Sequence, residues 1–369
     1  MKSFKLAAVV CLWAGALLAA GMSAHAQPAR RGAVFAMTNA ADGNQVVAFA
    51  RAADGSLHQT GSFATGGNGS GGTIDPLHSQ GSLVLNDDHR LLFAVNAGSG
   101  TVSSFAVLGS TLKLLDTASS RGSQPSAVAV FENLLYVLNM GGNGNVTGFR
   151  ILPNGRLLPI PGSTRNLSAG NTAPTSLVFS PNGRVLVVAE SATNKIDTFR
   201  VLPNGTLSAI TTTDSEGAVP FAALFTPSGV LIVANASNTI SSYSVNWSQK
   251  LETITAALPT EGQATCWSVI LPNGRVIYTA NAGTSNLSGY RIGWNGSLTP
   301  IGDTIVGANP AGSVNLDIAV STDGRFLYTL NGGTGTIGVF AVERDGSLEN
   351  QAEVEGLPAG AGINGIAAY

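Results

Sequence analysis

The chain repeats one pattern seven times. A short apolar segment ends in Asn or Glu, and an aromatic residue follows eight to ten positions later. Successive segment ends are 57, 43, 51, 45, 46 and 50 residues apart, which is the size of one β-propeller blade. The segment ends, called anchors below, are Asn39, Asn96, Asn139, Glu190, Asn235, Asn281 and Asn331, and the aromatic residues are Phe49, Phe105, Phe149, Phe199, Tyr243, Tyr290 and Phe340.

The apolar spacing within each repeat indicates β-strands, because no helical spacing is sustained over three turns. An apolar residue lies three positions before each aromatic residue, as with Val46 and Phe49. Residues three apart on a strand point to opposite faces, so both faces of each sheet are apolar. Such a sheet has to pack between two others, as a propeller blade does.

Turn sequences place two hairpins in each repeat and therefore four strands in each blade. Pro-Asn-Gly occurs at 181–183 before a second strand and at 203–205 after a third strand. Residues 33–39 are second-strand sequence with no first strand before them, whereas residues 362–369 resemble first strands. We predict an all-β domain at residues 27–369: one seven-bladed β-propeller of antiparallel blades, closed by the C-terminal strand joining the N-terminal blade.

The first 26 residues have the composition of a signal peptide. Lys2 and Lys5 precede an apolar run at 6–21, and small residues at 24 and 26 predict cleavage before Gln27. No stretch reaches the roughly 18 to 20 apolar residues of a membrane-spanning helix. We therefore expect a secreted or periplasmic protein without a membrane span, and the sequence does not distinguish a bacterial from a eukaryotic export route.

Cysteine and charge content exclude two further classes. Cys11 lies in the predicted signal peptide, so Cys266 has no partner for an internal disulfide. Cleavage would leave 17 basic against 21 acidic residues, and the basic residues are scattered singly. Nucleic-acid binding is therefore not expected, and we expect a monomer.

Three second strands carry a recognisable motif. Residues 136–139, 278–281 and 328–331 are Tyr-Val-Leu-Asn, Tyr-Thr-Ala-Asn and Tyr-Thr-Leu-Asn. They resemble the Tyr-Val-Thr-Asn propeller repeat, and the whole chain from residue 27 is similar to the seven-bladed lactonase family, which includes 6-phosphogluconolactonase and fungal carboxymuconate cyclase. The resemblance implies a lactone hydrolase of propeller fold.

The resemblance also implies a His, with an Arg nearby, where certain first strands begin, and a Glu directly after a second-strand Asn. In this chain residues 124–126 are Gln-Pro-Ser and residues 174–176 are Pro-Thr-Ser. None of the residues that follow the anchors is acidic: Ala40, Ala97, Met140, Ser191, Ala236, Ala282 and Gly332.

Candidate catalytic residues are Glu190, Asp317 and His78. Glu190 is the one anchor that is not Asn, and it either faces a ligand or forms a salt bridge or a solvated carboxylate. Asp317 interrupts an apolar first strand, where a carboxylate has to be hydrated, paired or bound to a ligand. His78 lies in the longest connection between blades and is a candidate general base, although a lone His without a partner does not establish that role.

Two tryptophans are candidate ligand-binding residues. Trp247 and Trp294 replace the turn proline in neighbouring hairpins after the third strand, where an exposed indole can stack on a sugar or a partner protein. Packing against an adjacent blade is the alternative. The glycine-rich segment 66–72 lacks the Lys-Ser/Thr ending of a phosphate-binding loop and is interpreted as a flexible loop.

Two functions remain open. The first is a binding propeller with a degenerate active site that holds a small ligand, a glycan or a protein partner, which the missing His, Arg and Glu favour. The second is hydrolysis of a small non-phosphorylated sugar or organic-acid lactone. No Cys/His spacing indicates a metal site, and no cofactor is expected.

Overall fold

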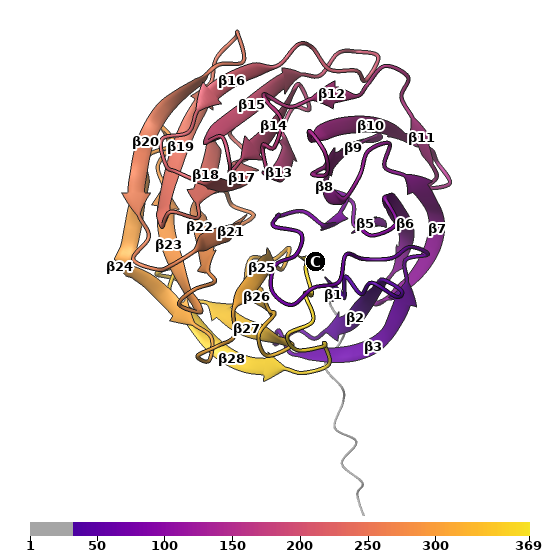
Figure 1. Cartoon of the computed structure of the whole chain (residues 1–369). Helices are drawn as coiled ribbons and strands as arrows, with labels where there is room; N and C mark the ends of the chain where they lie inside the picture. The colour runs from indigo at the N-terminus through magenta and orange to yellow at the C-terminus, as the bar shows by residue number, and fades with distance from the viewer. Residues whose placement is uncertain (1–31) are drawn as a thin grey trace, which may run out of the picture.

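The chain folds into a ring of seven four-stranded antiparallel sheets, as predicted (Figure 1). The structure, a computed structural model, describes residues 32–369. The predicted signal peptide and its cleavage site before Gln27 lie outside the described residues. Within residues 32–369 every regular element is a strand. First strands of neighbouring blades contact one another around the ring, so they line its axis.

The strands follow in chain order except in blade 1, which begins with the last strand. Blade 1 consists of β29 (Ile366–Ala368), β1 (Gly32–Met37), β2 (Gln45–Arg51) and β3 (Leu57–Ala64). Blade 2 consists of β4 (Leu83–Leu85), β5 (Leu91–Asn96), β6 (Thr101–Leu108) and β7 (Thr111–Ser119). Blade 3 consists of β8 (Pro125–Phe131), β9 (Leu134–Asn139), β10 (Asn145–Ile151) and an outer strand divided into β11 (Leu157–Pro159) and β12 (Arg165–Asn166).

The other four blades have the same order from the axis outward. Blade 4 consists of β13 (Pro174–Phe179), β14 (Val185–Glu190), β15 (Lys195–Arg200) and β16 (Thr211–Asp214). Blade 5 consists of β17 (Pro220–Phe225), β18 (Leu231–Asn235), β19 (Thr239–Val245) and β20 (Leu251–Pro259). Blade 6 consists of β21 (Thr265–Ile270), β22 (Val276–Asn281), β23 (Asn286–Ile292) and β24 (Leu298–Ala308). Blade 7 consists of β25 (Asn315–Val320), β26 (Phe326–Asn331), β27 (Thr336–Val342) and β28 (Leu348–Val354).

The C-terminal strand closes the ring. Strand β29 pairs antiparallel with β1, Ala367 opposite Phe35, which confirms the predicted role of the tail. Ile363 and Ile366 of the tail are buried between blades 1 and 7. The two ends of the described chain are therefore joined through one sheet, and the ring has no open blade edge at its seam.

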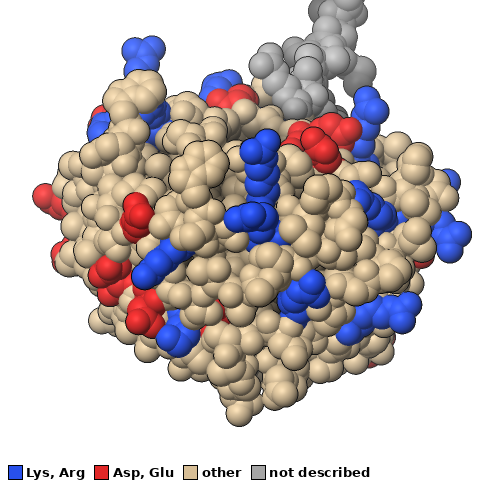
Figure 2. Space-filling view, turned by 90° about the horizontal axis from the view of Figure 1, so that it is seen from above, with Lys and Arg blue, Asp and Glu red and all other residues tan. Residues whose placement is uncertain are grey.

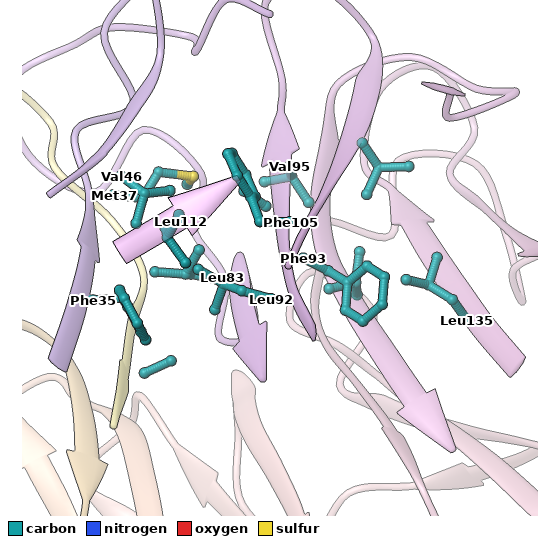
Figure 3. Packing of buried hydrophobic residues seen from close by; sticks show 14 of the residues in the cluster. Phe35, Met37, Val46, Leu83, Leu92, Phe93, Val95, Phe105, Leu112 and Leu135 are labelled. Atoms are coloured by element: carbon teal, nitrogen blue, oxygen red, sulfur yellow. The ribbon is translucent and has the colours of Figure 1, made fainter. Parts of the chain in front are cut away.

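Each sheet is buried on both faces, as the spacing of Val46 and Phe49 predicts. Val46 packs with Phe35 against Leu92 of blade 2, whereas Phe49 packs on the other side against Tyr328 of blade 7. Figure 3 shows the first of these interfaces, with the side chains of blades 1 and 2 facing each other. The repeat thus specifies seven similar apolar interfaces.

A hydroxyl also connects every blade to the next one. In each interface, a hydroxyl donates to a backbone carbonyl in the hairpin after the third strand of the next blade. We call these bonds the hydroxyl latches. From blade 1 to blade 7 the pairs are Thr60–Ser110, Ser104–Gly155, Tyr136–Gly205, Thr198–Gln249, Ser242–Gly296, Tyr278–Gly346 and Tyr328–Gly55. The tyrosines of the repeat motif are thus three of the seven donors.

Candidate functional site

A long connection, residues 65–82, leads from β3 to β4 and crosses the axis of the ring. We call it the central loop; it lies on the face where the second strands end, called the anchor face here. In Figure 1 it is the indigo segment in the middle of the ring. The Ser79 hydroxyl donates to the Ser126 carbonyl of blade 3 (2.8 Å), and the Trp267 indole of blade 6 donates to the Ser79 carbonyl (3.0 Å). The loop thus bridges blades on different sides of the axis.

Gln80 fixes the central loop to blades 4 and 6. Its side-chain amide donates to the Ser268 carbonyl and accepts from the Ser268 N–H, both at 2.9 Å. Its backbone N–H donates to the Thr175 carbonyl at 2.8 Å. Both backbone groups of Ser268 are therefore satisfied by the loop, as they would be by a neighbouring strand.

The glycine-rich part of the loop is packed rather than free, contrary to the sequence interpretation of 66–72. The Gly69 N–H donates to the Ala40 carbonyl and the Gly71 N–H to the Asn39 carbonyl. A Cβ at Gly69 would lie 2.2 Å from the Asn39 backbone, so only glycine permits this approach.

His78 lies between an acid and a hydroxyl. Its Nδ1 is 3.6 Å from Asp75 Oδ2, and its Nε2 is 3.4 Å from Ser191 Oγ, which follows the blade 4 anchor. The Ser191 hydroxyl also donates to the Ala173 carbonyl at 2.8 Å. An acid, an imidazole and a hydroxyl in this order can move a proton from the hydroxyl, and such contacts are often loose without substrate.

Asp75 and His78 have backbone conformations that side chains seldom adopt. Their φ angles are 42° and 44°, in the left-handed region that favours glycine. Each such residue costs of order 1 kcal/mol and persists only where its surroundings hold it. Here the His78 N–H donates to the Asp75 carbonyl (3.2 Å), and this hydrogen bond stabilises the two strained residues.

The acid is covered and the imidazole reaches solvent. The Asp75 side chain is 16% exposed and the His78 side chain 42%. Asn364, from the C-terminal tail, donates its amide to Asp75 Oδ1 at 3.1 Å. Burial raises the pKa of Asp75, and the nearby His78 opposes that rise.

Asp317 lies beside Asp75 but is buried in the ring. Its Oδ2 accepts from the Ile366 N–H of β29 (3.0 Å), and its Oδ1 accepts from the Ile318 N–H (2.8 Å). Burial raises the pKa of Asp317 to about 7, the two backbone N–H groups oppose this, and the Asp75 charge adds to it. Asp317 has 3% of its surface exposed and supports the ring closure through its bond to β29.

Aromatic side chains form the apolar base of this cluster. The ring of Phe221 meets His78 edge-on at 5.0 Å, and Trp267 packs on Phe221 at 4.9 Å. Cys266 is buried beside them, and burial raises the pKa of its thiol. The thiol is therefore neutral, and Phe221 and Trp267 exclude water from one side of the imidazole.

Glu190 lies apart from His78 in a buried pair of acids. Its carboxylate accepts from the Ser168 N–H (2.9 Å) and from the Ser168 and Thr193 hydroxyls (both 2.5 Å). A hydrogen bond from the neighbouring Asp197 joins the two acids, and burial followed by Glu190 raises the pKa of Asp197 to about 8. The pair therefore holds a proton at neutral pH.

The pair is a variant of the ordinary anchor contact. In blade 2 Asn96 donates to the Ser103 hydroxyl, and in blade 6 Asn281 donates to the Ser288 hydroxyl, both at 2.8 Å. Blade 4 replaces both partners with acids. None of the hydrogen bonds or ion pairs within residues 32–369 links Glu190 to the His78 cluster.

The two candidate tryptophans lie on the opposite face, where the hairpin turns are located and which we call the turn face. Trp247 and Trp294 are 96% and 90% exposed, so neither packs against an adjacent blade. Arg275 covers one face of Trp294, with its guanidinium carbon 3.0 Å from the ring centre.

The structure thus brings His78 together with Asp75 and Ser191, places Asp317 within electrostatic reach of Asp75, and binds the Glu190 carboxylate in a different cluster. Sequence reasoning missed Asp75, Ser191 and Asp197. Ser191 carried a signal, because it is the one hydroxyl residue directly after an anchor. Within residues 32–369 no group of His, Cys, Asp or Glu is arranged to hold a metal ion. In the same part of the chain, no helix has the length and apolarity needed to span a membrane.

Fold and cluster together define a seven-bladed β-propeller with a polar site over the axis of its anchor face. The family model for lactonases of the 7-bladed β-propeller type matches residues 156–267 and 272–358, more than half of the chain. The chain belongs to this lactonase family.

Solved structures share the fold at low sequence identity. The periplasmic gluconolactonase of Pseudomonas aeruginosa is 18% identical and aligns with a TM-score of 0.68 over 90% of this chain and 99% of its own. A protein from Lactobacillus plantarum is 18% identical and aligns with a TM-score of 0.72 over 91% of this chain and 98% of its own. A search of curated proteins finds no significant match.

Proposed function

We propose that this protein hydrolyses a small, non-phosphorylated lactone at the anchor face. The observation that carries the proposal is the Asp75–His78–Ser191 series, in which the two ring nitrogens of His78 face an acid and a hydroxyl. Membership in the lactonase family supports the reaction class.

The chemistry follows from the order of the three groups. The Ser191 hydroxyl turns from the Ala173 carbonyl toward His78 Nε2, which takes its proton, and Ser191 Oγ attacks the lactone carbonyl. The ring C–O bond breaks, and the leaving oxygen takes the proton from His78. Water, deprotonated by His78, then attacks the Ser191 ester. The bond between the acyl carbon and Ser191 Oγ breaks, the hydroxy acid leaves, and His78 returns the proton to Ser191 Oγ. Asp75 stabilises the imidazolium in both steps.

The charge of the site favours a substrate without phosphate. No Lys or Arg joins the hydrogen bonds or ion pairs of Asp75, His78 and Ser191 within residues 32–369. An ionised Asp75 carboxylate would repel a phosphoryl group. A neutral aldonolactone fits these surroundings, and the name of the Pseudomonas aeruginosa relative, a periplasmic gluconolactonase, is compatible with such a substrate.

The proposal includes the oligomeric state and the location of the protein. We propose a monomer that works outside the cytoplasm, in the periplasm or after secretion. Phosphorylated sugars are retained in the cytoplasm, so an exported enzyme would meet the non-phosphorylated substrate.

A panel of aldonolactones, their 6-phosphorylated forms and organic-acid lactones tests the function. His78→Gln and Ser191→Ala should each lower kcat/KM on the preferred lactone by about 100-fold or more, because removal of a base or nucleophile has effects of this size. Proton release measured in weak buffer, minus the spontaneous rate, gives the turnover.

Two matched controls separate chemistry from folding. Ser237 of blade 5 also follows an anchor closely and donates to a loop carbonyl, that of Ala218 (2.7 Å), and His58 is an exposed histidine. Ser237→Ala and His58→Gln should retain the wild-type rate. No turnover of any lactone by the wild type, or equal rates for Ser191→Ala and Ser237→Ala, would refute the proposal.

A second candidate function, ligand binding without catalysis, is favoured by one specific observation. A cavity of about 1140 Å³ lies on the turn face and does not include the His78 cluster. This cavity is the subject of the inference below.

A further inference from the structure

A groove of about 1140 Å³ lies on the turn face, under blades 3, 4 and 5. We call it the arginine groove. Hairpin turns line it, including the proline turns that begin at Pro181, Pro203 and Pro227. Proline fixes the backbone of such turns, so the walls are rigid before any ligand arrives.

Three guanidinium groups line the groove, one from blade 3 and two from blade 4. They belong to Arg150, Arg184 and Arg200, and Glu132 is the one acidic residue among the lining residues. None of the three arginines forms an ion pair within residues 32–369; Arg150 donates to the Asn133 side chain and Arg200 to the Trp247 carbonyl. The groove is therefore positively charged, whereas the chain as a whole has a net charge of −2.

The position of this charge is specific, because charge is scattered elsewhere. Figure 2 shows both basic and acidic side chains spread over the side of the ring that it displays. The groove brings three arginines into one concave site, and a guanidinium binds a carboxylate through two parallel hydrogen bonds.

Trp247 forms the blade 5 side of the groove. Its side chain is 96% exposed, and within residues 32–369 no cation covers its ring, in contrast to Trp294 under Arg275. A flat exposed indole is the surface on which the apolar face of a pyranose ring stacks. The concave shape, the three arginines and the exposed indole of Trp247 together fit a sugar that carries carboxylates.

A peptide ligand fits less well, because the turns use their own backbone groups. The N–H groups of Gly183, Gly205 and Gly229 donate to carbonyls within their own turns. Hairpin turns line much of the groove, whereas a peptide added as a strand needs a strand edge. The arginine side chains of the lining offer donors that suit hydroxyl and carboxylate groups.

We propose that the arginine groove binds an acidic polysaccharide, a chain of uronic acid residues, with its carboxylates on Arg150, Arg184 and Arg200 and one pyranose ring on Trp247. This activity is separate from lactone hydrolysis at the anchor face and does not depend on it. It holds the protein on an anionic glycan while the other face remains open to solvent.

Calorimetric titration of the full protein with an oligogalacturonate tests the inference. Arg184→Gln and Trp247→Ala should each weaken binding about tenfold, since a charge-assisted hydrogen bond or an aromatic contact has this size. Binding should weaken with salt, and the methyl-esterified oligogalacturonate, which has the same rings without charge, should not bind.

The matched controls come from blades outside the groove. Arg325 follows the turn glycine of blade 7 as Arg184 follows that of blade 4, and Trp294 is the other exposed tryptophan. Arg325→Gln and Trp294→Ala should bind as the wild type does, and all four variants should hydrolyse lactone at the wild-type rate. The inference is overturned if the oligogalacturonate does not bind, if its methyl ester binds equally, or if poly-glutamate binds as tightly through the same residues.

Discussion

The candidate site depends on three side chains from two distant segments. His78 was singled out from the sequence because few histidines are present, whereas its partners Asp75 and Ser191 were not. Neither Asp75 nor Ser191 is part of the repeated pattern. His78 contacts Ser191 because the central loop crosses the axis to blade 4. Repeat patterns in a sequence identify residues that recur from blade to blade. The contact between His78 and Ser191 occurs once, through a long loop, so the pattern did not predict it.

Glu190 shows the opposite case, a visible exception with a local explanation. The sequence marks it as the one anchor that is not Asn, but the compensating change at Asp197 becomes visible only when the third strand is aligned with Ser103 and Ser288 of other blades. The two acids share a proton in the interior of blade 4. Glu190 therefore differs from the other anchors because acids replace both the anchor Asn and the third-strand Ser in blade 4.

This pair predicts a pH-dependent stability. The pKa of Asp197 is about 8 in the folded protein, against an ordinary value of 3.8, so its contribution to stability is present at low pH and is lost as pH rises from about 4 to 8. Asp197→Asn keeps a donor toward Glu190 and removes the titration. The variant should gain stability relative to the wild type between pH 5 and pH 8, by about 1 to 3 kcal/mol at the upper end.

Urea unfolding at several pH values measures this difference. Asp214→Asn, which removes an exposed acid of the same blade paired with Lys195, serves as the control and should not show the same trend. If Asp197→Asn lost the same stability at pH 5 and pH 8, the proton would not be shared as described.

The blades are joined by a contact that the repeat motif encodes. The strands were predictable to within a few residues; for example, residues 33–39 were expected to form a strand, and β1 is Gly32–Met37. The role of the motif tyrosines was not predictable. A hydroxyl latch joins two blades, and the sequence of one blade does not show which carbonyl of the next blade accepts the bond. The hydroxyl of Tyr328 reaches the turn carbonyl of Gly55 across the seam (3.2 Å).

Removal of one latch should weaken one interface. Tyr328→Phe keeps the buried ring and leaves the Gly55 carbonyl without its donor, so the free energy of unfolding should fall by about 1 to 2 kcal/mol. Tyr369→Phe removes a hydroxyl outside the latches and should cost less than about 0.5 kcal/mol. Equal losses in the two variants, measured by urea unfolding, would show that the latch contributes nothing.

The whole ring depends on its seam between blades 7 and 1. The closure was predictable, since the missing first strand and the surplus tail are both visible in the sequence. The tail also carries Asn364, which binds Asp75, and its Ile366 N–H donates to Asp317. Closure of the ring and support of the candidate site therefore use the same segment, and this link was not evident from the sequence.

The seam predicts a large effect from one buried side chain. Ile366→Ala should lower the free energy of unfolding by about 2 to 5 kcal/mol, because it opens a cavity between the end blades. Ile74→Ala removes an isoleucine that is 61% exposed on the central loop and should cost less than about 0.5 kcal/mol. A small loss at Ile366, comparable to that at Ile74, would mean that the tail does not hold the ring together.

Covalent labelling of Ser191 tests the central claim most directly, because it requires no knowledge of the natural substrate. A fluorophosphonate reacts with a serine that a histidine deprotonates, and peptide mass spectrometry locates the label. We predict labelling of Ser191 in the wild type and loss of that label in His78→Gln, with Ser237 unlabelled in both. An unlabelled Ser191, or a label that persists in His78→Gln, would contradict the account.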